Sequence, residues 1–97
     1  MTQQELPEYI IETAEGDYQV NLSKAVDIDG AKVSVLTMRE PTVQDMLAAE
    51  LQSKGQGAAQ QEIYLLANLC DVAPEHIKSM TLKNYSRMQE AFKLFTS

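Results

Sequence analysis

Few residues of this 97-residue chain have the types and the spacing that catalysis or metal binding requires. Arg39 and Glu40 are adjacent, but no nucleophile or second acid follows at a spacing typical of general acid–base chemistry. We interpret them as a helix-positioning ion pair or a solvated strand end. Asp27 and Asp29 flank Ile28, yet the later ligands of a calcium loop, including its bidentate Glu, are missing. This second pattern predicts a turn rather than a calcium site.

Cys70 and His76 are the single cysteine and the single histidine of the chain. One cysteine forms no internal disulfide, which fits a reducing cytoplasm, and two soft ligands do not make a zinc site. We expect Cys70 to be a small buried hydrophobic residue and His76 to be a surface histidine. The glycines of Gly55-Gln56-Gly57 lack the Lys-Ser/Thr that follows in a phosphate loop. We therefore predict no catalytic residue, no metal, no cofactor and no small-molecule substrate.

The acidic charge is concentrated at the N-terminus. Residues 1–17 contain five acids and no base, which gives −5, and the other residues contain nine acids and eight bases, which gives −1 of the total of −6. Because Lys and Arg are not clustered, we expect no nucleic-acid partner. The apolar runs are far shorter than the about 20 residues that span a bilayer, and no basic start precedes an apolar run. We expect neither a membrane segment nor a secretory signal.

A β-hairpin is predicted at residues 18–38. Apolar residues alternate on one parity from Tyr18 to Ile28, and Asp29-Gly30 is a strong signal for a two-residue type I′ turn. The return strand, from Ala31 to Met38, changes its apolar parity between Val35 and Leu36. A bulge or a strand end would explain that change.

The segment of residues 1–17 has two interpretations. Its polar and acidic composition predicts a mobile N-terminal segment that precedes a single domain of residues 18–97. In the alternative, Tyr9 to Ile11 adds a third strand to a sheet edge or pairs with a neighbouring subunit.

A strand-to-helix junction follows the hairpin. Pro41 lacks a backbone donor and favours an extended conformation at Glu40. Thr42 is then placed to cap a helix, and Asp45, three residues later, completes a capping-box pattern. We interpret six residues of the turn and the junction as structural: Gly30, Arg39, Glu40, Pro41, Thr42 and Asp45.

Three helices are predicted after the junction. They cover about Val43 to Ser53, Ala59 to Cys70, and residues 82–95 after a cap at Thr81, with a single helical turn starting at Pro74. The fold class is therefore α+β, an antiparallel hairpin packed against about three helices. The apolar stripes are Val43, Met46, Leu47 and Leu51; then Ile63, Leu66, Ala67 and Cys70, widened by Tyr64, Leu65 and Leu69; then Leu82, Tyr85, Met88, Phe92 and Phe95. Asn84, Ser86, Glu90 and Lys93 fall elsewhere on the last helix.

Some of these apolar residues exceed what a small core needs. We expect Met46, Met88 and Phe92 to fill the core. The wide stripes on the second and third helices predict a homo-oligomer of undetermined stoichiometry. The candidates for contact with a partner are Tyr85, Leu94, Phe95, Leu65 and Leu69.

The order of the motifs resembles the tail assembly chaperones of contractile-tailed bacteriophages, of the Mu-like or P2-like kind. The likeness covers roughly residues 24–96, and its most distinctive part is R-E-P-T at Arg39 to Thr42. The motifs are I-D-G at Ile28 to Gly30, L-T-M-R-E-P-T-V at Leu36 to Val43 followed by D-M-L-A-A-E, E-I-Y-L-L-A-N-L-C at Glu62 to Cys70, V-A-P-E-H-I at Val72 to Ile77, and L-K-N-Y-S-R-M-Q-E-A-F-K-L-F at Leu82 to Phe95.

The resemblance implies a protein that is not an enzyme. Such chaperones are thought to coat the long, hydrophobic, helical tape measure protein in the host cytoplasm until tail tube subunits replace them. They are absent from the finished particle. A longer product is often made in this family by ribosomal frameshifting.

Two other functions remain open from the residues alone. One is a structural tail or adaptor subunit that stays in the particle. The other is a small acidic regulator, such as an antitoxin, that neutralises a basic partner through residues 1–17.

Overall fold

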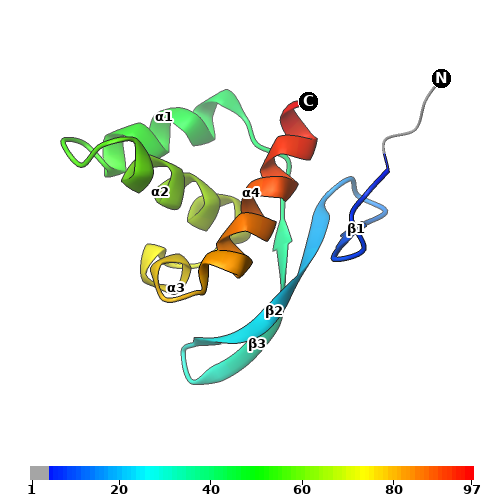
Figure 1. Ribbon diagram of the computed structural model, residues 1–97. Coiled ribbons are helices and arrows are strands. Elements are labelled where there is room, and N and C mark those ends of the chain that lie inside the picture. The colour runs from blue at the N-terminus through cyan, green and yellow to red at the C-terminus, as the bar shows by residue number, and fades with distance from the viewer. Residues whose placement is uncertain (1–4) are drawn as a thin grey trace.

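A three-stranded antiparallel sheet forms the first part of the computed structural model, which describes residues 5–97. The strands are β1 (Ile10–Glu12), β2 (Tyr18–Ile28) and β3 (Ala31–Met38), in the order β1-β2-β3 (Figure 1). The third strand confirms the alternative in which Tyr9 to Ile11 extends the sheet. Residues 1–4 lie outside the described residues, and both the mobility of the acidic segment and its boundary at residue 17 stay predictions.

The turn between β2 and β3 has the conformation that its sequence predicts. Asp29 and Gly30 have φ values of 53° and 87°, and a type I′ turn requires positive φ at both positions. The Asp27 carboxylate accepts a hydrogen bond from the Gly30 amide at 3.1 Å and lies 3.7 Å from the Lys32 ammonium. Asp27 therefore closes the turn.

A bulge in β2 explains the parity change of β3. The strands pair in register from Tyr18↔Met38 to Asn21↔Val35, and pairing resumes at Val26↔Val33. Residues 22–25 of β2 thus lie opposite a single residue of β3. Because of this irregularity, Val33 and Leu36 both contribute to the core side of the sheet, whereas Val35 is exposed.

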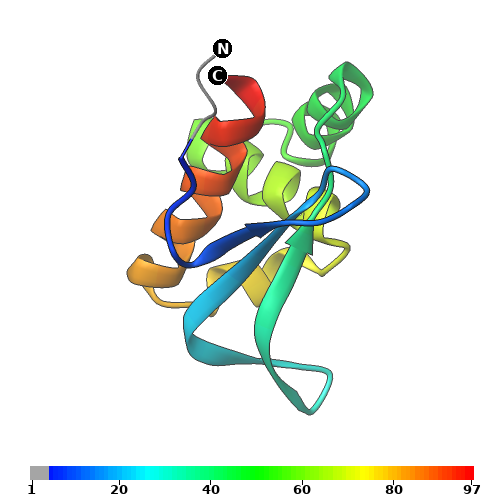
Figure 2. The ribbon, with the colours of Figure 1, turned by 90° about the vertical axis from the view of Figure 1, so that its right-hand side faces the viewer.

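Four helices follow the sheet: α1 (Val43–Gln52), α2 (Ala58–Cys70), α3 (Pro74–Lys78) and α4 (Leu82–Thr96). The helices cover one face of the sheet, with α4 along β2 and α2 against β3, as Figures 1 and 2 show. The main packing partner of α1 is α2, so α1 forms the outer edge of the helical layer. None of these helices, in the part of the chain that is described, has the length and apolar content to cross a membrane.

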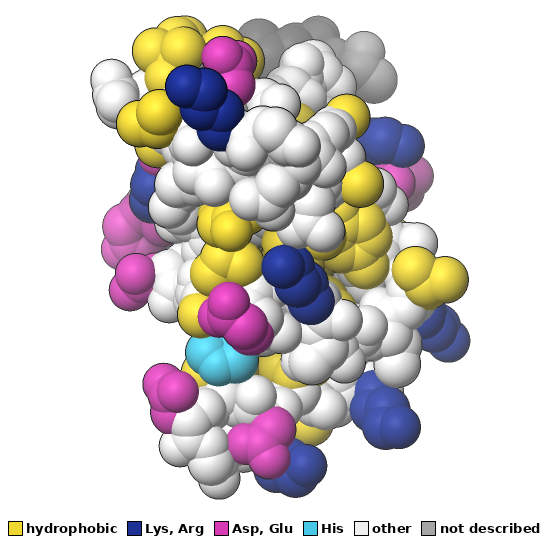
Figure 3. Space-filling model, turned by 90° about the vertical axis from the view of Figure 1, so that its left-hand side faces the viewer, with side chains coloured by type: hydrophobic (Ala, Val, Ile, Leu, Met, Phe, Trp, Pro, Cys, Tyr) yellow, Lys and Arg dark blue, Asp and Glu magenta, His cyan; other side chains and the backbone are white. Residues whose placement is uncertain are grey.

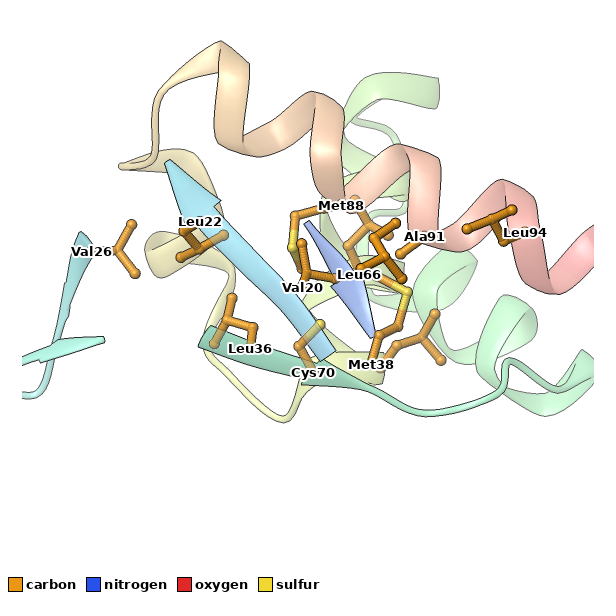
Figure 4. Packing of buried hydrophobic residues seen from close by; sticks show 12 residues of the cluster. Val20, Leu22, Val26, Leu36, Met38, Leu66, Cys70, Met88, Ala91 and Leu94 are labelled. Carbon is orange, nitrogen blue, oxygen red and sulfur yellow. The ribbon is translucent and has the colours of Figure 1, made fainter. Parts of the chain in front are cut away.

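The core lies between the sheet and α2 and α4. Val20 and Met38 from the sheet meet Leu66 and Met88 from the helices, and none of the four side chains is more than 1% exposed (Figure 4). Met88 is confirmed as a core residue, and Phe92 packs against the core while remaining partly exposed. Cys70 is the small buried hydrophobic residue that was predicted, and burial raises the pKa of its thiol to about 12.

Two residues of α4 lie where the sequence pattern did not place them. Leu82 belongs to the apolar stripe but is 83% exposed at the helix start. Asn84, which was assigned to the polar side, is fully buried. Its side-chain oxygen accepts hydrogen bonds from the Ser23 amide at 2.8 Å and the Ser23 hydroxyl at 3.0 Å, and its amide donates to the Lys24 carbonyl at 2.7 Å. Asn84 is buried because it replaces the strand partners that the bulge lacks.

Arg87, about one helical turn after Asn84 on α4, contacts the same part of β2. Its guanidinium donates to the Asn21 carbonyl at 2.8 Å and stacks over the Tyr9 ring, 4.6 Å from the ring centroid. The irregular stretch of β2 and the residues before β1 are therefore both tied to α4.

Candidate partner-binding site

The apolar stripe of α1 faces solvent. Val43, Met46, Leu47 and Leu51 are 71%, 46%, 50% and 74% exposed. The prediction that Met46 fills the core is therefore wrong. The helix instead turns Asp45 and Ala49 inward, next to the buried Ser53 that ends it. These small and polar groups allow close contact with α2, and the large side chains are left outside.

The start of α1 is fixed by the capping box predicted from the sequence. Thr42 has extended φ and ψ values of −120° and 166°, and its hydroxyl oxygen accepts a hydrogen bond from the Asp45 amide at 3.2 Å. The Asp45 carboxylate accepts one from the Thr42 amide at 2.9 Å. These reciprocal bonds satisfy two backbone donors that a helix start otherwise leaves unpaired.

Arg39 joins the end of β3 to this cap. Its guanidinium donates two hydrogen bonds to the Asp45 carboxylate, both at 2.7 Å, and its backbone amide donates to the Leu69 carbonyl at 3.1 Å. The Arg39 hydrogen bonds hold the pKa of Asp45 well below its usual range. Arg39 therefore pairs with Asp45, whereas the neighbouring Glu40 is exposed. The ion pair sets the direction in which α1 leaves the sheet.

An apolar groove runs between α1, α2 and the end of α4. Its most apolar section, about 260 Å³, is lined by Pro41, Thr42, Val43, Met46, Leu65, Phe92 and Thr96. A second hollow shares Leu65 and Phe92 with the first, and a third, beside the α1–α2 loop, shares Ala58 and Gln61 with the second. We call these three adjoining hollows together the α1–α2–α4 groove.

Polar groups border the groove on both sides. Glu62 accepts hydrogen bonds from the Tyr85 hydroxyl and, at 2.8 Å, from the Gln89 amide, while Glu50 and Lys54 lie at the loop end. Figure 3 views the helical end of the molecule and shows hydrophobic side chains gathered at its upper edge, beside acidic and basic ones. An apolar floor with a polar border is typical of surfaces that bind other proteins.

The five residues predicted to contact a partner do not lie on one surface of the structure. Leu69 and Leu94 are buried, at 2% and 8% exposure. Phe95 packs on Tyr18 with ring centroids 4.4 Å apart, and the pKa of Tyr85 is raised by burial and by Glu62. Leu65 alone among the five lines the groove. A role of these residues in partner binding stays a prediction.

The exposed residues of α1 were missed as candidates although their stripe was visible in the sequence. The residues on the opposite side of the same helix could have indicated that this stripe faces solvent. Asp45 and Ala49 are four residues apart and too small to fill a core layer, so the large side chains had no clear partner within the domain. The small residues therefore favour the orientation in which the large ones face solvent.

The single histidine has a structural use. His76 is only 19% exposed rather than a surface residue, because its Nδ1 accepts a hydrogen bond from the Ala73 amide at 3.2 Å and its Nε2 lies 3.9 Å from the Asp29 carboxylate. Within residues 5–97, no three His, Cys, Asp or Glu side chains are grouped so that they could hold a metal ion. The geometry is suited to binding an apolar surface.

Comparison with known proteins supports that interpretation. The family model described as "Phage tail assembly chaperone proteins, E, or 41 or 14" matches residues 19–97, which include β2, β3 and all four helices. Searches of curated proteins and of solved structures gave no match. Because the family model covers most of the chain, including the groove and the Arg39–Asp45 junction, the protein belongs to the phage tail assembly chaperone family.

Proposed function

We propose that this chaperone binds the tape measure protein of a contractile-tailed phage, of the Mu-like or P2-like kind, through the α1–α2–α4 groove. It keeps that client soluble in the bacterial cytoplasm until tail tube subunits replace it, and it is absent from the finished particle. The observation that carries the proposal is the open apolar groove, which lies within the part of the chain that matches the chaperone family.

The groove has the features that an amphipathic helix of the client requires. Such a helix inserts side chains at spacings of three and four residues into an apolar trough. Leu65 and Phe92 supply the floor, and Met46 forms a wall with an unbranched side chain that adapts to different apolar shapes. This adaptability suits a client that presents many similar helical segments.

The size of the groove also fits a partner that must be released. Burying one large apolar side chain contributes about 1.5–3 kcal/mol, and association itself costs several kcal/mol. Because a few such contacts exceed that cost only narrowly, we expect weak and readily reversible binding. Tail tube subunits that bind the same client more extensively then displace the chaperone without any covalent step.

Co-expression with the tape measure protein tests the proposal. The wild-type chaperone should keep the client soluble and copurify with it. Met46→Glu places a charge on the groove wall and should leave the client insoluble. Leu82→Glu introduces the same charge at an exposed leucine outside the groove and should behave as the wild type. A client that stays insoluble with the wild-type protein would contradict the proposal.

The protein composition of purified phage particles distinguishes a chaperone from a structural subunit. The proposal expects the chain to be missing from them, and its presence in stoichiometric amount would favour the tail or adaptor alternative. The acidic-regulator alternative is tested by replacing the exposed residues Glu5, Glu8 and Glu15 with Gln. Replacement is preferable to deletion of the segment, because Ile10 lies in the core. If the tape measure protein no longer copurifies with that variant, binding depends on the acidic segment, as the acidic-regulator alternative expects.

A further inference from the structure

A carboxylate, Glu62, lies in the hollow that adjoins the most apolar section of the α1–α2–α4 groove. This hollow has a volume of about 290 Å³ and is lined by Ala58, Gln61, Glu62, Leu65 and Phe92. Among the described residues that line it, none is a Lys or an Arg. We call it the Glu62 hollow. It combines a negative charge with two large apolar side chains and has no base of its own.

The Glu62 carboxylate is held through one of its two oxygens. Its Oε1 accepts hydrogen bonds from the Tyr85 hydroxyl and, at 2.8 Å, from the Gln89 amide. Among residues 5–97, no donor bonds its Oε2 and no ion pair includes it. Because Tyr85 and Gln89 already orient the carboxylate, Glu62 loses little side-chain freedom when a donor from another molecule meets Oε2.

We propose that Glu62 selects client helices that carry a Lys or an Arg close to their apolar residues. The side chain of either residue has an apolar stem and a cationic head. In the Glu62 hollow the stem packs on Leu65 and Phe92, and the head donates to Oε2 of Glu62. Charge-assisted hydrogen bonds of this kind are stronger than neutral ones. The inference rests on the proposed function and deepens it, because it names the chemistry of the helix that the groove accepts.

The arrangement of the hollows also gives the spacing of this cation on the client. The Glu62 hollow and the apolar section share Leu65 and Phe92, so the two adjoin each other. Side chains three or four residues apart on a helix have Cβ atoms about 5–6 Å apart. One apolar side chain of the client therefore enters the apolar section, and a Lys or Arg three or four positions away enters the Glu62 hollow.

A structural role alone would not require the charge of Glu62. Glutamine at this position retains an oxygen that accepts hydrogen bonds from Tyr85 and Gln89, so Glu62→Gln should melt like the wild type. The wild-type residue instead keeps an anion beside apolar side chains, where an unpaired charge costs free energy. Tyr85 and Gln89 are therefore positioning residues that hold Glu62 ready for a cation.

Two synthetic amphipathic peptides test the proposal. Both carry leucines at spacings of three and four residues. They differ only at the positions four residues before and after the central leucine, which are Lys in one peptide and Gln in the other. The wild type should bind the lysine peptide about three- to tenfold more tightly than the glutamine peptide. This preference should shrink at about 1 M salt, where the Debye length is about 3 Å.

Three variants locate the preference. Glu62→Gln should bind both peptides equally, with the affinity of the wild type for the glutamine peptide. Glu75→Gln removes the same charge at an exposed position outside the groove. It should keep the wild-type preference and so controls for the net charge of −6. Tyr85→Phe removes a hydrogen bond that orients Glu62 and should reduce the preference without changing the affinity for the glutamine peptide.

The results distinguish this inference from the proposed function. Met46→Glu should weaken the binding of both peptides, which places them in the groove. If the wild type binds both equally and Met46→Glu weakens both, the groove binds helices but Glu62 does not select a cation, and the inference is wrong. It is also wrong if Glu62→Gln keeps the wild-type preference. If neither peptide binds the wild type, the proposed function fails as well.

Discussion

The two ends of the helical layer show opposite relations between polarity and burial. At the β2–α4 contact a polar side chain, Asn84, is fully buried, and both ends of its amide are hydrogen-bonded to the β2 bulge. On α1, large apolar side chains are exposed, and no neighbour among residues 5–97 covers them. The first region uses a polar group to complete the fold, whereas the second leaves apolar area exposed.

Because of this contrast, we expect substitutions in the first region to change stability and those in the second to change binding. Removing a buried, hydrogen-bonded group leaves its partners unsatisfied and lowers the free energy of unfolding. Removing an exposed apolar group changes the free energy of unfolding little and instead changes association. Variants in the two regions should therefore give opposite results in melting and binding experiments.

A large loss of stability is expected at Asn84. Asn84→Ala should lower the free energy of unfolding by about 2–3 kcal/mol, because the Ser23 amide and the Lys24 carbonyl lose their partner. Ser86→Ala, at an exposed position of the same helix, should change it by less than about 0.5 kcal/mol. Denaturant unfolding measures both, and equal values would contradict the structural role of Asn84.

A smaller loss is expected at the junction that holds α1. Asp45→Ala should lower the free energy of unfolding by about 2 kcal/mol, since it removes both Arg39 hydrogen bonds and half of the capping box. Gln44→Ala, at the exposed neighbouring position, is the control. If Asp45→Ala has no effect, the ion pair does not position the helix.

The same carboxylate predicts a dependence of stability on pH. The pKa of Asp45 is lower in the folded state than in the unfolded chain, mainly because of Arg39. The contribution of Asp45 to the free energy of unfolding is therefore complete above the ordinary Asp pKa of about 4. It is lost as the pH falls from that value toward the folded-state pKa. Asp45→Asn should flatten the stability profile below about pH 4. An unchanged slope in urea titrations at those pH values would contradict the assignment.

The cap itself contributes less. Thr42→Ala should lower the free energy of unfolding by about 1 kcal/mol, because the Asp45 amide loses its acceptor. Thr42→Ser retains the hydroxyl and should recover most of that loss. If both variants melt like the wild type, the cap does not stabilise α1.

The smallest effect is expected on the exposed side of α1. Leu51→Ser should change the free energy of unfolding by less than about 0.5 kcal/mol, since Leu51 is 74% exposed. Leu66→Ala, at 1% exposure on the neighbouring helix, should cost about 2–5 kcal/mol. A large loss at Leu51 would mean that the exposed side of α1 supports the fold, and the contrast between the two regions would fail.

Local features of this fold could be predicted from the sequence because they depend on neighbouring residues. Asp29-Gly30 specifies the hairpin turn, and Thr42 with Asp45 specifies the start of α1. Pro74 marks the start of α3, and Thr81 caps α4. In each case the residues that decide the structure lie within four positions of one another.

The features that were missed depend on residues far apart in the chain. Asn84 is buried because it bonds Ser23, 61 residues earlier, and no periodicity in α4 contains that information. The stripe of α1 defines one side of a helix but does not say whether another element covers it. In this fold Asp45 and Ala49 are the buried residues of α1, whose main packing partner is α2, so the larger side chains remain exposed.

The central proposal is that Met46, on the exposed wall of the groove, contributes to client binding and not to the stability of the fold. Titration of a purified tape measure segment onto Met46→Glu and onto Leu82→Glu tests it most directly. We predict that Met46→Glu keeps the wild-type melting temperature and binds at least about tenfold more weakly, while Leu82→Glu binds as the wild type does. Unchanged affinity in a folded Met46→Glu variant would contradict the claim.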